Sequence, residues 1–303
     1  MKRKGIKTGV LPGICACTFV CMIACMAACA SARETESENA LMRVEEIALE
    51  EEPDALPDAQ GSITVGTVGI PYSELLTQAK ILLAKDGWEL NVVPYDDLTL
   101  LNQDLLNQTL DAHLFAHETY LESYNDVQQT NLIAVTPVIY EKYGIYSKSN
   151  DDLTKYTDGI TVGIPAEETQ QAKALSFLWD MGYLTLKEGL GLTASTEDIT
   201  EDAYHVTFME YTQDTAKACF EQCDYCIMGA NQAILAGLEP HKDMLAGETG
   251  KMESAKLLAA YLVTTPENTE SEKIRVLEEV LDSETIKQYV KDHYKEAYAT
   301  FAE

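Results

Sequence analysis

The chain has 303 residues, of which 46% are hydrophobic and 24% are charged, a composition typical of a folded globular protein with room for about two domains. Its formal net charge is -28, and a basic patch cannot dominate so acidic a surface. We therefore expect no binding to nucleic acid. Five of the eight cysteines lie in the first thirty residues, which excludes a small secreted domain held together by evenly spread disulfides.

The N-terminus carries the pattern of a secretory signal. Four basic residues come first, and an uncharged apolar run follows over residues 8–28. Two alanines and Cys29 end the run, and this ending resembles a bacterial lipobox, in which the cysteine receives palmitate-type acyl chains and becomes the new N-terminus. Two or more such chains hold a protein stably on a bilayer. We therefore predict a signal peptide over residues 1–28, lipidation at Cys29, and a body anchored at the extracytoplasmic face of the cell membrane.

Two alternatives for this segment remain open. Cys25 also follows small and apolar residues, and it is a second candidate for lipidation. The apolar run is about 20 residues long, so an uncleaved membrane-spanning anchor is the other alternative. Residues 29–61 are rich in Glu and Asp and contain two prolines, and we expect this acidic segment to form an extended tether.

Strand and helix patterns alternate from residue 62 onward. In the first half they predict strands over 63–68, 88–95 and 132–140 and helices over 74–85, 98–108 and 118–125. Ser73 is placed to cap the first helix. From residue 112 to 117, small apolar residues alternate with His113, Phe115 and His117. This period of two predicts a strand whose polar and aromatic face suits a small ligand.

The same kind of pattern restarts after residue 150. The strand predicted over 160–164 repeats the sequence ITVG of the first strand. The other expected elements are helices over 151–156, 166–181, 213–222, 231–238, 271–283 and 284–301, and strands over 206–211, 225–229 and 257–264. Strands that alternate with helices indicate βαβ units and largely parallel sheets.

Two such sets of elements suggest an α/β fold with two lobes and a ligand cleft between them. The chain would cross between the lobes twice, near Tyr143 and near residues 247–250, and two crossings form a hinge. The predicted boundaries are 62–142 plus 248–303 for lobe 1 and 143–247 for lobe 2. Open α/β sheets bind ligands beyond the carboxyl ends of their strands, where we expect Tyr72, His117 and the loop at 166–171.

Other chemistry has little support in the sequence. Cys219, Cys223 and Cys226 have a spacing that also occurs in iron–sulfur sites. They span a predicted helix end and a buried strand, so we interpret them as buried free cysteines, with a disulfide between two of them as the next alternative. His113 and His117, four residues apart on one strand, would be about 13 Å apart and unable to share a zinc ion. We predict no metal, no cofactor and no catalytic residue.

Five segments of the body resemble the NlpA-type lipoproteins, the methionine-binding receptors of bacterial ABC importers. They occur in the family's order and read LDAHLFAHETYL at 110–121, YGIYSKS at 143–149, GYLTLKEGLGL at 182–192, EDIT at 197–200 and AGLEPHKDML at 236–245. The resemblance covers residues 63–301. It implies a two-lobed periplasmic-binding-protein fold (type II-like) that closes on an amino acid, with Phe115, His117 and Tyr120 lining the ligand site.

The resemblance also implies ligand contacts in the second lobe. Family members carry a loop P-N-D-x-x-N-x-x-R whose asparagine and arginine grip the carboxylate and amino groups of the ligand. Gln170 and Lys173 take these two places here, and Asn231 matches a further asparagine. Lysine offers a point charge where arginine offers a planar fork, so another amino acid or a short peptide is an alternative to methionine. Tyr72 and Tyr143 complete the predicted site, with core packing as the alternative for Phe115, Tyr120 and Tyr143.

We therefore predict a membrane-anchored solute-binding lipoprotein that delivers an amino acid, methionine first, to the transmembrane subunits of an ABC permease by hinge closure. Such a protein is not an enzyme. Two alternatives belong to other classes. An exported α/β enzyme without a recognisable motif would show turnover, and an adhesion or interaction lipoprotein would have an empty, closed-off cleft.

Overall fold

A computed structural model describes residues 59–301, which belong to one compact unit. The predicted signal peptide, the candidate lipidation sites Cys29 and Cys25 and nearly all of the predicted tether lie outside the described residues. Within residues 59–301, no helix combines the length and the apolar character that a membrane span requires.

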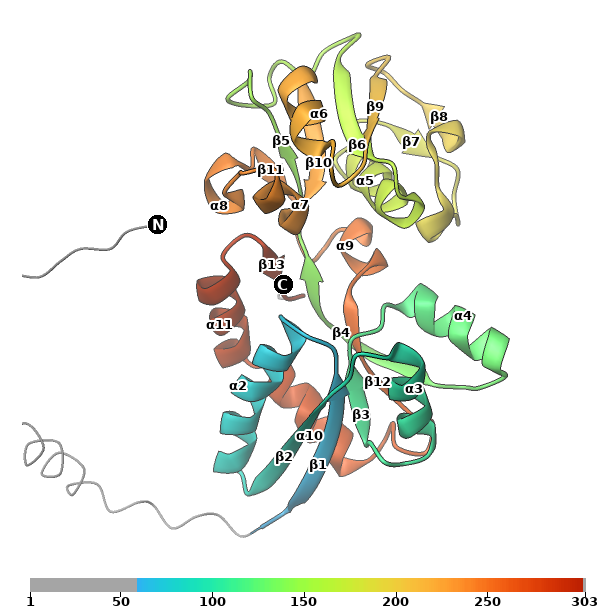
Figure 1. Ribbon diagram of the computed structural model, residues 1–303, viewed down its shortest axis with the longest axis vertical. Coiled ribbons are helices and arrows are strands. Elements are labelled where there is room, and N and C mark those ends of the chain that lie inside the picture. Colours follow the sequence, from blue (N-terminus) through green and yellow to red (C-terminus); the bar gives the residue numbers. More distant parts are fainter. Residues whose placement is uncertain (1–58, 302–303) are drawn as a thin grey trace, which may run out of the picture. The chain divides into compact units, whose positions relative to one another are not determined.

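Strands and helices alternate along most of the body (Figure 1). The strands are β1 (Gly61–Thr67), β2 (Trp88–Pro94), β3 (Ala112–Leu114), β4 (Ile133–Glu141), β5 (Tyr143–Tyr146), β6 (Thr161–Pro165), β7 (Thr185–Leu186), β8 (Ile199–Glu201), β9 (Thr207–Tyr211), β10 (Tyr225–Gly229), β11 (Ala246–Gly247), β12 (Ala260–Thr264) and β13 (Tyr298–Ala299). The helices are α2 (Tyr72–Lys85), α3 (Leu98–Leu106), α4 (Glu118–Gln128), α5 (Glu168–Asp180), α6 (Ala216–Gln222), α7 (Ala230–Leu235), α8 (Pro240–Asp243), α9 (Glu253–Leu257), α10 (Glu272–Leu281) and α11 (Glu284–Tyr294), with 3-10 turns η1 (Gly191–Thr193) and η2 (Thr196–Asp198).

The strands form two principal sheets. A six-stranded sheet has the order β13-β4-β12-β3-β1-β2, and a five-stranded sheet has the order β11-β5-β10-β6-β9. Both sheets are mixed rather than largely parallel, because β12 runs antiparallel to β3 and β4, and β5 runs antiparallel to β10. The reason is the path of the chain: β5 follows β4 across the junction, and β12 returns to the six-stranded sheet after β11 and α9. Both strands therefore run away from the junction, opposite to strands that end there.

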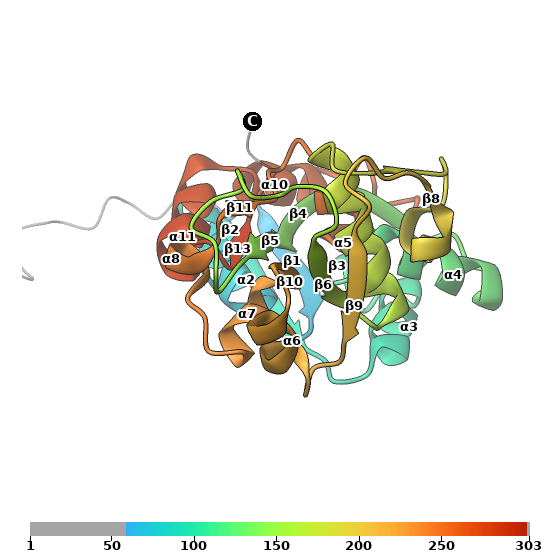
Figure 2. The same cartoon turned by 90° about the horizontal axis from the view of Figure 1, so that it is seen from above.

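Each sheet is covered by helices on both faces (Figures 1 and 2). On the six-stranded sheet, α2, α10 and α11 share one apolar core with Leu262, whereas α3 and α4 share another with Val263. On the five-stranded sheet, α5 packs with Ile227, and α6 and α7 pack with Cys226. Adjacent residues of a strand point to opposite faces, so one strand serves two cores.

Three predicted details are wrong. Residues 151–156 form turns instead of a helix, because the Asp152 carboxylate accepts a hydrogen bond from the main-chain N–H two residues later (2.9 Å) and fixes a local turn. The last helix ends at Tyr294 rather than at residue 301, since Lys295 has a φ of 52°, and the chain continues into β13. Ser73 is not an N-cap, because α2 begins one residue before it and no side chain caps the helix.

The repeated ITVG sequence places a glycine at the same point of β1 and β6. A Cβ atom on Gly66 would lie 2.4 Å from Leu101 Cδ1, and one on Gly163 would lie 2.7 Å from the Sγ atoms of both Cys219 and Cys226. In both sheets the glycine therefore allows side chains of a covering helix to come close to the strand.

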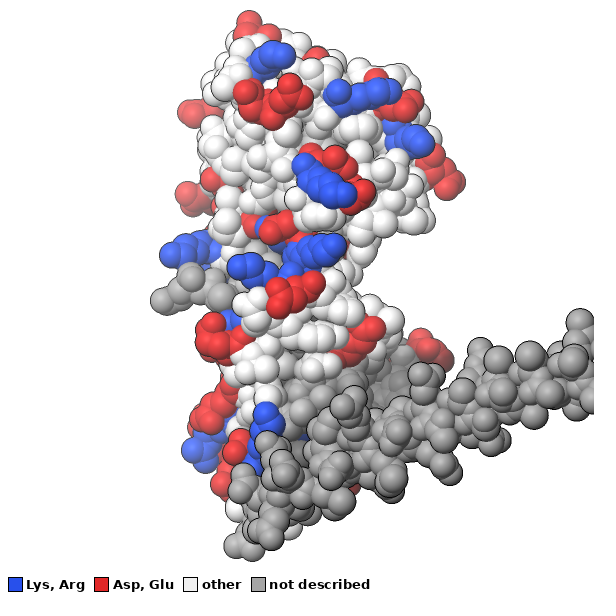
Figure 3. Space-filling model, turned by 90° about the vertical axis from the view of Figure 1, so that its left-hand side faces the viewer, with Lys and Arg blue, Asp and Glu red and all other residues white. Residues whose placement is uncertain are grey.

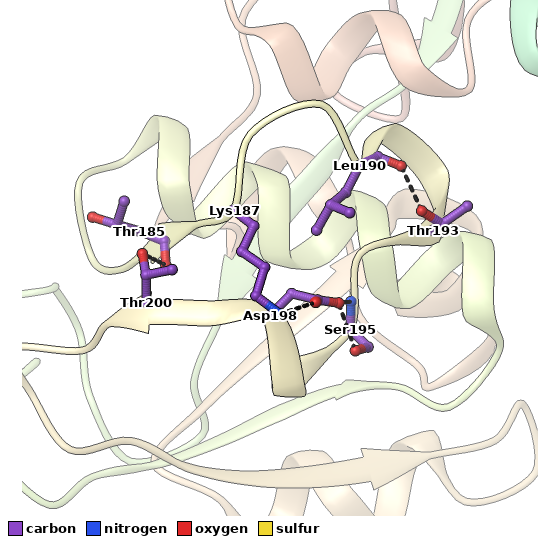
Figure 4. Close-up of polar contacts among 7 residues, drawn as sticks. All are labelled: Thr185, Lys187, Leu190, Thr193, Ser195, Asp198 and Thr200. Atoms are coloured by element: carbon purple, nitrogen blue, oxygen red, sulfur yellow. Dashed lines mark hydrogen bonds and ion pairs between the residues drawn. The ribbon is translucent and has the colours of Figure 1, made fainter.

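Two of the segments that resemble the family form a small hairpin-like sheet of β7 and β8 (Figure 4). The Asp198 carboxylate accepts hydrogen bonds from the Lys187 ammonium (2.9 Å), from the Ser195 hydroxyl (2.9 Å) and from the Ser195 N–H (3.1 Å). Thr200 Oγ1 donates to the Thr185 carbonyl (3.2 Å). These contacts hold the segment together by local polar bonds on the surface of the second lobe.

Candidate functional site

The strand of alternating His and Phe residues is shorter than the sequence suggests. β3 ends at Leu114, and all three of its residues are buried, including His113. The predicted polar face is therefore wrong for His113, because β3 is a central strand with helices on both sides. His113 Nε2 lies 3.0 Å from Asn102 Oδ1, and since that oxygen only accepts, the ring is a donor there. His113 is a core residue, not part of the ligand surface.

Burial makes His113 a pH-sensitive element of the core. It lowers the pKa of His113 from 6.5 to about 3, so the unfolded chain takes up a proton at a pH where the folded chain does not. The free energy of unfolding is therefore highest above pH 6.5, and it decreases as the pH falls toward 3. We expect this residue to cost about 2 kcal/mol of unfolding free energy between pH 6.5 and pH 5, because one pKa unit corresponds to about 1.4 kcal/mol. Urea unfolding at the two pH values measures it.

The His113→Gln variant should lose this component of the pH dependence, because Gln keeps an N–H donor for Asn102 and does not titrate. His205→Gln is the comparison variant. His205 is exposed and its hydrogen bond with Asp158 raises its pKa, so its removal should leave the loss of stability on acidification in place or slightly increase it. A Gln variant with the full wild-type pH dependence would show that His113 is not its source.

Three predicted residues follow β3 and lie near the start of α4. His117 is the N-cap of α4, and its Nδ1 accepts a hydrogen bond from the Tyr120 N–H (3.2 Å). Burial lowers the pKa of His117, so the ring is neutral at pH 7 and carries its proton on Nε2. The ring of Phe115 packs edge-on against Tyr72 with 5.7 Å between centroids. The structure thus brings Phe115 together with Tyr72, and His117 together with Tyr120.

The two predicted residues of α5 have different environments. Gln170 is exposed in the first turn of the helix, whereas the Lys173 side chain is completely buried. The Lys173 ammonium lies 3.2 Å from Glu248 Oε2 and donates to the Glu141 carbonyl (3.0 Å), and it sits 4.8 Å from the centre of the Tyr143 ring. Its partners in this structure are protein groups, and its predicted contact with a ligand stays a prediction.

These contacts concentrate at the two places where the chain passes between the sheets. Glu141 ends β4 at the first crossing, and Glu248 follows β11 at the second. Glu248 Oε2 also accepts a hydrogen bond from the Tyr143 N–H (2.9 Å). Burial raises the pKa of Glu248, and the Lys173 ammonium partly opposes this rise. Lys173 therefore ties both crossing segments to α5.

Asn231 of α7 makes two hydrogen bonds to residues of the six-stranded sheet. Its N–H donates to Glu141 Oε1 (2.7 Å), and its side-chain amide donates to the Tyr298 hydroxyl (2.8 Å). Burial raises the pKa of Tyr72, and the neighbouring Tyr298 and Glu141 add to the rise, so these side chains lie close together. Burial raises the pKa of Glu141. We call the following residues the junction cluster: Tyr72, Glu141, Tyr143, Lys173, Asn231 and Tyr298.

Four of these six residues belong to the site predicted from the sequence, whereas Glu141, Tyr298 and the ion-pair partner Glu248 do not. Glu141 and Glu248 lie close to the two predicted crossings, but nothing in the sequence distinguishes them from the other acids. Tyr298 gave no signal either, because its position in a predicted helix concealed the strand β13.

The comparison with known proteins now decides the family. Residues 63–301 match the sequence profile of the NlpA lipoprotein family. The chain belongs to the NlpA lipoprotein family. The resemblance stated from the sequence motifs is thereby confirmed.

Relatives within the NlpA family cover most of the chain. Membrane lipoprotein TpN32 of Treponema pallidum is 26% identical over 77% of this chain and 86% of its own length. Methionine-binding lipoprotein MetQ of Bacillus subtilis is 28% identical over 80% and 88%. The solved structure of a YaeC-family lipoprotein from Enterococcus faecalis is 28% identical, covers 79% of this chain and 98% of that one, and has a TM-score of 0.63. The two-lobed α/β fold expected for the family is confirmed.

A cavity of about 320 Å³ lies along α11 of this NlpA family member, and Tyr298 of the junction cluster forms part of its lining. Charged side chains dominate its lining, among them Lys142, Lys287, Lys291 and Glu296, and Figure 3 shows lysines gathered on this face between acidic neighbours. Lys142 pairs with Glu296, and Lys287 lies 3.1 Å from Asp282. None of the residues that the sequence assigned to the ligand site lines this cavity.

Proposed function

We propose that this protein is the solute-binding lipoprotein of a bacterial ABC importer and that its ligand is a free amino acid, with methionine as the first candidate. The names of the relatives point to methionine. The observation that carries the proposal is the junction cluster, in which charged, amide and phenol groups from both lobes meet beside an aromatic pair. This combination of groups is suited to a zwitterion with an apolar side chain.

The geometry supports a role for each group. The Glu141 carboxylate accepts the ammonium group of the ligand, because it is largely removed from water and only one of its oxygens is committed to Asn231. The His117 Nε2–H and the Asn231 amide donate to the ligand's carboxylate, and Gln170 reaches it as α5 approaches. The edge-on pair of Tyr72 and Phe115 packs against the apolar side chain.

Closure of the two lobes traps the ligand in this scheme. The six-stranded sheet uses only residues before 142 and after 259, and the five-stranded sheet uses only residues 143–247. This supports the division into lobe 1 (62–142 plus 248–303) and lobe 2 (143–247). Lobes connected by two segments can rotate about them, and the liganded, closed form is then recognised by the permease.

The N-terminal features complete the proposal. We place a signal peptide at residues 1–28, a lipid anchor at Cys29 and an acidic tether up to residue 61, so that the body works at the extracytoplasmic face of the membrane. Its partners are the amino acid and the transmembrane subunits of the permease. The protein carries its ligand unchanged and catalyses no reaction.

A thermal-shift screen tests the proposal. Protein that has been unfolded, dialysed and refolded is mixed with single amino acids, including methionine and the cationic ones, and with dipeptides. Ligand at 100 times its Kd adds about 2.7 kcal/mol of stability, which corresponds to a rise in Tm of roughly 5–10 °C for a body of this size. No shift with any of these compounds at millimolar concentration would contradict the proposal.

The ligand carried by the purified protein provides an independent check. Mass spectrometry of small molecules released on denaturation should recover an amino acid in near-equimolar amount. A dipeptide in its place would favour the alternative of a peptide receptor. Conversion of any added compound during the same incubation would instead favour an exported enzyme.

A further inference from the structure

Three cysteines of the second lobe meet at one point although they come from two elements. Cys219 lies in α6, Cys223 follows its last residue, and Cys226 lies in β10. In Figure 1, α6 lies along β10, and it contacts β6 and β9 as well. The three Sγ atoms all lie within 4.8 Å of one another. All three cysteines are buried and none forms a disulfide.

A missing side chain on the neighbouring strand makes room for this convergence. Gly163 of β6 borders the cluster, and a Cβ atom there would lie 2.7 Å from two of the sulfurs and 3.2 Å from the Sγ of Cys223. Any side chain at this position would push the sulfurs apart. The glycine therefore keeps the three thiols in mutual contact instead of letting them pack separately as small hydrophobic residues.

The surroundings of the three sulfurs are almost entirely apolar. Tyr211, Met228 and Phe220 pack around them, Cys219 Sγ lies 3.6 Å from the Met209 carbonyl, and the Cys223 thiol has a hydrogen bond with the backbone of Gly163. Over residues 59–301, no His, Asp or Glu joins the three cysteines in this group. The site thus offers three soft sulfur donors, and no carboxylate or imidazole of the described residues lies close enough to join them.

The spacing of the sulfurs suits a single metal ion. A metal bonded to three thiolates at about 2.3 Å in a plane holds its sulfurs about 4 Å apart. The observed limit of 4.8 Å means that each pair has to approach by less than about 1 Å. Such a movement is within the reach of side-chain torsions alone.

We propose that Cys219, Cys223 and Cys226 form a three-thiolate site for one soft metal ion, Cu(I). Thiolate ligands select Cu(I), zinc and iron–sulfur clusters. Structural zinc sites have four protein ligands, and this group has three, whereas Cu(I) is satisfied by three sulfurs in an apolar pocket. Each thiol that becomes a ligand gives its proton to the solvent, and the metal keeps its oxidation state, so binding needs no oxidant or reductant. This inference does not depend on the proposed function.

Metal titration of the full chain in detergent under argon tests the proposal. The five N-terminal cysteines are replaced by Ser, so that only the three buried thiols remain. Cu(I) is added in competition with a coloured Cu(I) chelator, and Zn(II) is added alone in a parallel titration. We expect one Cu(I) per chain, an ultraviolet thiolate-to-copper absorption band and protection of all three thiols from a thiol reagent.

Variants show whether Cu(I) binding depends on the close approach of the three sulfurs or only on the presence of the thiols. Cys219→Ser, Cys223→Ser and Cys226→Ser should each weaken Cu(I) binding about 100-fold or more, since changes beyond the ligands alone cost 10- to 100-fold. Gly163→Ala keeps all three thiols and should still weaken binding at least about 10-fold. Gly66→Ala is its matched control, because it crowds the same position of the other lobe and leaves the sulfurs untouched.

Three results would overturn the proposal. One is Cu(I) affinity that survives the single Ser substitutions. Another is a zinc affinity above that for Cu(I). The third is a disulfide within the cluster. Protein prepared without reductant would then have a mass two hydrogens below that of the reduced protein, and it would retain one free thiol. If Gly163→Ala does not fold, the three Ser variants decide.

Discussion

Lys173→Met is expected to destabilise the protein by about 3–5 kcal/mol at pH 7. The side chains of Lys173 and Glu248 are both completely buried, and methionine fills the volume of the lysine without its charge. Removal of one partner of a buried ion pair leaves the other as an uncompensated buried charge, which carries this cost. The interaction of the ammonium with the Tyr143 ring is lost as well. Urea unfolding followed by circular dichroism measures the change.

Two further variants show whether the loss comes from the buried pair. Lys173→Met combined with Glu248→Gln should recover most of the stability, because neither member of the pair then leaves its partner as an uncompensated charge. Lys187→Met removes the exposed partner of Asp198 and should cost less than about 1 kcal/mol. Equal losses for Lys173→Met and Lys187→Met would contradict this account.

The stable double variant also tests the ligand contact predicted for Lys173. If the ammonium grips the ligand's carboxylate, the double variant folds but binds its amino acid much more weakly. Unchanged affinity would mean that Lys173 only stabilises the two crossing segments. Uncharged hydrogen-bond donors would then bind the ligand's carboxylate. The stability and binding roles of this residue are thereby separated.

Glu141→Gln is expected to raise the Kd for an amino acid by about 10- to 100-fold while leaving the fold intact. The carboxylate is the group that we assign to the ligand's ammonium, and hydrogen bonds to charged groups contribute about 1.5–3 kcal/mol. Glutamine keeps the oxygen that accepts from the Asn231 N–H but lacks the negative charge. Isothermal titration calorimetry with the ligand identified in the screen measures the effect.

A control variant and a control ligand restrict the interpretation. Glu296→Gln removes a partly exposed carboxylate that pairs with Lys142, and it should change the Kd less than about threefold. The N-acetyl form of the ligand has no ammonium, so its weak binding should be the same in wild type and Glu141→Gln. Loss of affinity for the N-acetyl form as well would indicate that Glu141 shapes the site without contacting the ammonium.

The sequence predicts most elements of the fold because their signals are local. The ITVG strands, the helices with apolar residues at helical spacing and the glycines between them all appear near their expected positions. β3 is different, since an alternating pattern indicates one exposed face only when the strand is covered on one side. The helices α2 and α3 cover the two faces of the strand Ala112–Leu114. The sequence of the strand itself does not indicate that both faces are covered.

Contacts at the crossings lie beyond sequence reasoning for another reason. Lys173 lies in an apolar helical stretch, where a lysine is unusual, but its partner Glu248 is 75 residues away and could not be chosen from the other acids. For the cysteines, the spacing places Cys219 and Cys223 on one helix face. Only the packing of α6 on β10, above Gly163, adds Cys226 to them.

The order of the strands has a consequence for the order in which the two sheets can form. The five-stranded sheet comes from one continuous stretch, residues 143–247, so it can form as soon as that stretch has been synthesised. In the six-stranded sheet, β3 pairs with β12, which follows almost 150 residues later. The early strands β1 to β3 must therefore wait with an unpaired edge, and an unpaired edge attracts other chains. The folding of this protein therefore depends on shielding that edge until the strand that ends at Thr264 has been synthesised.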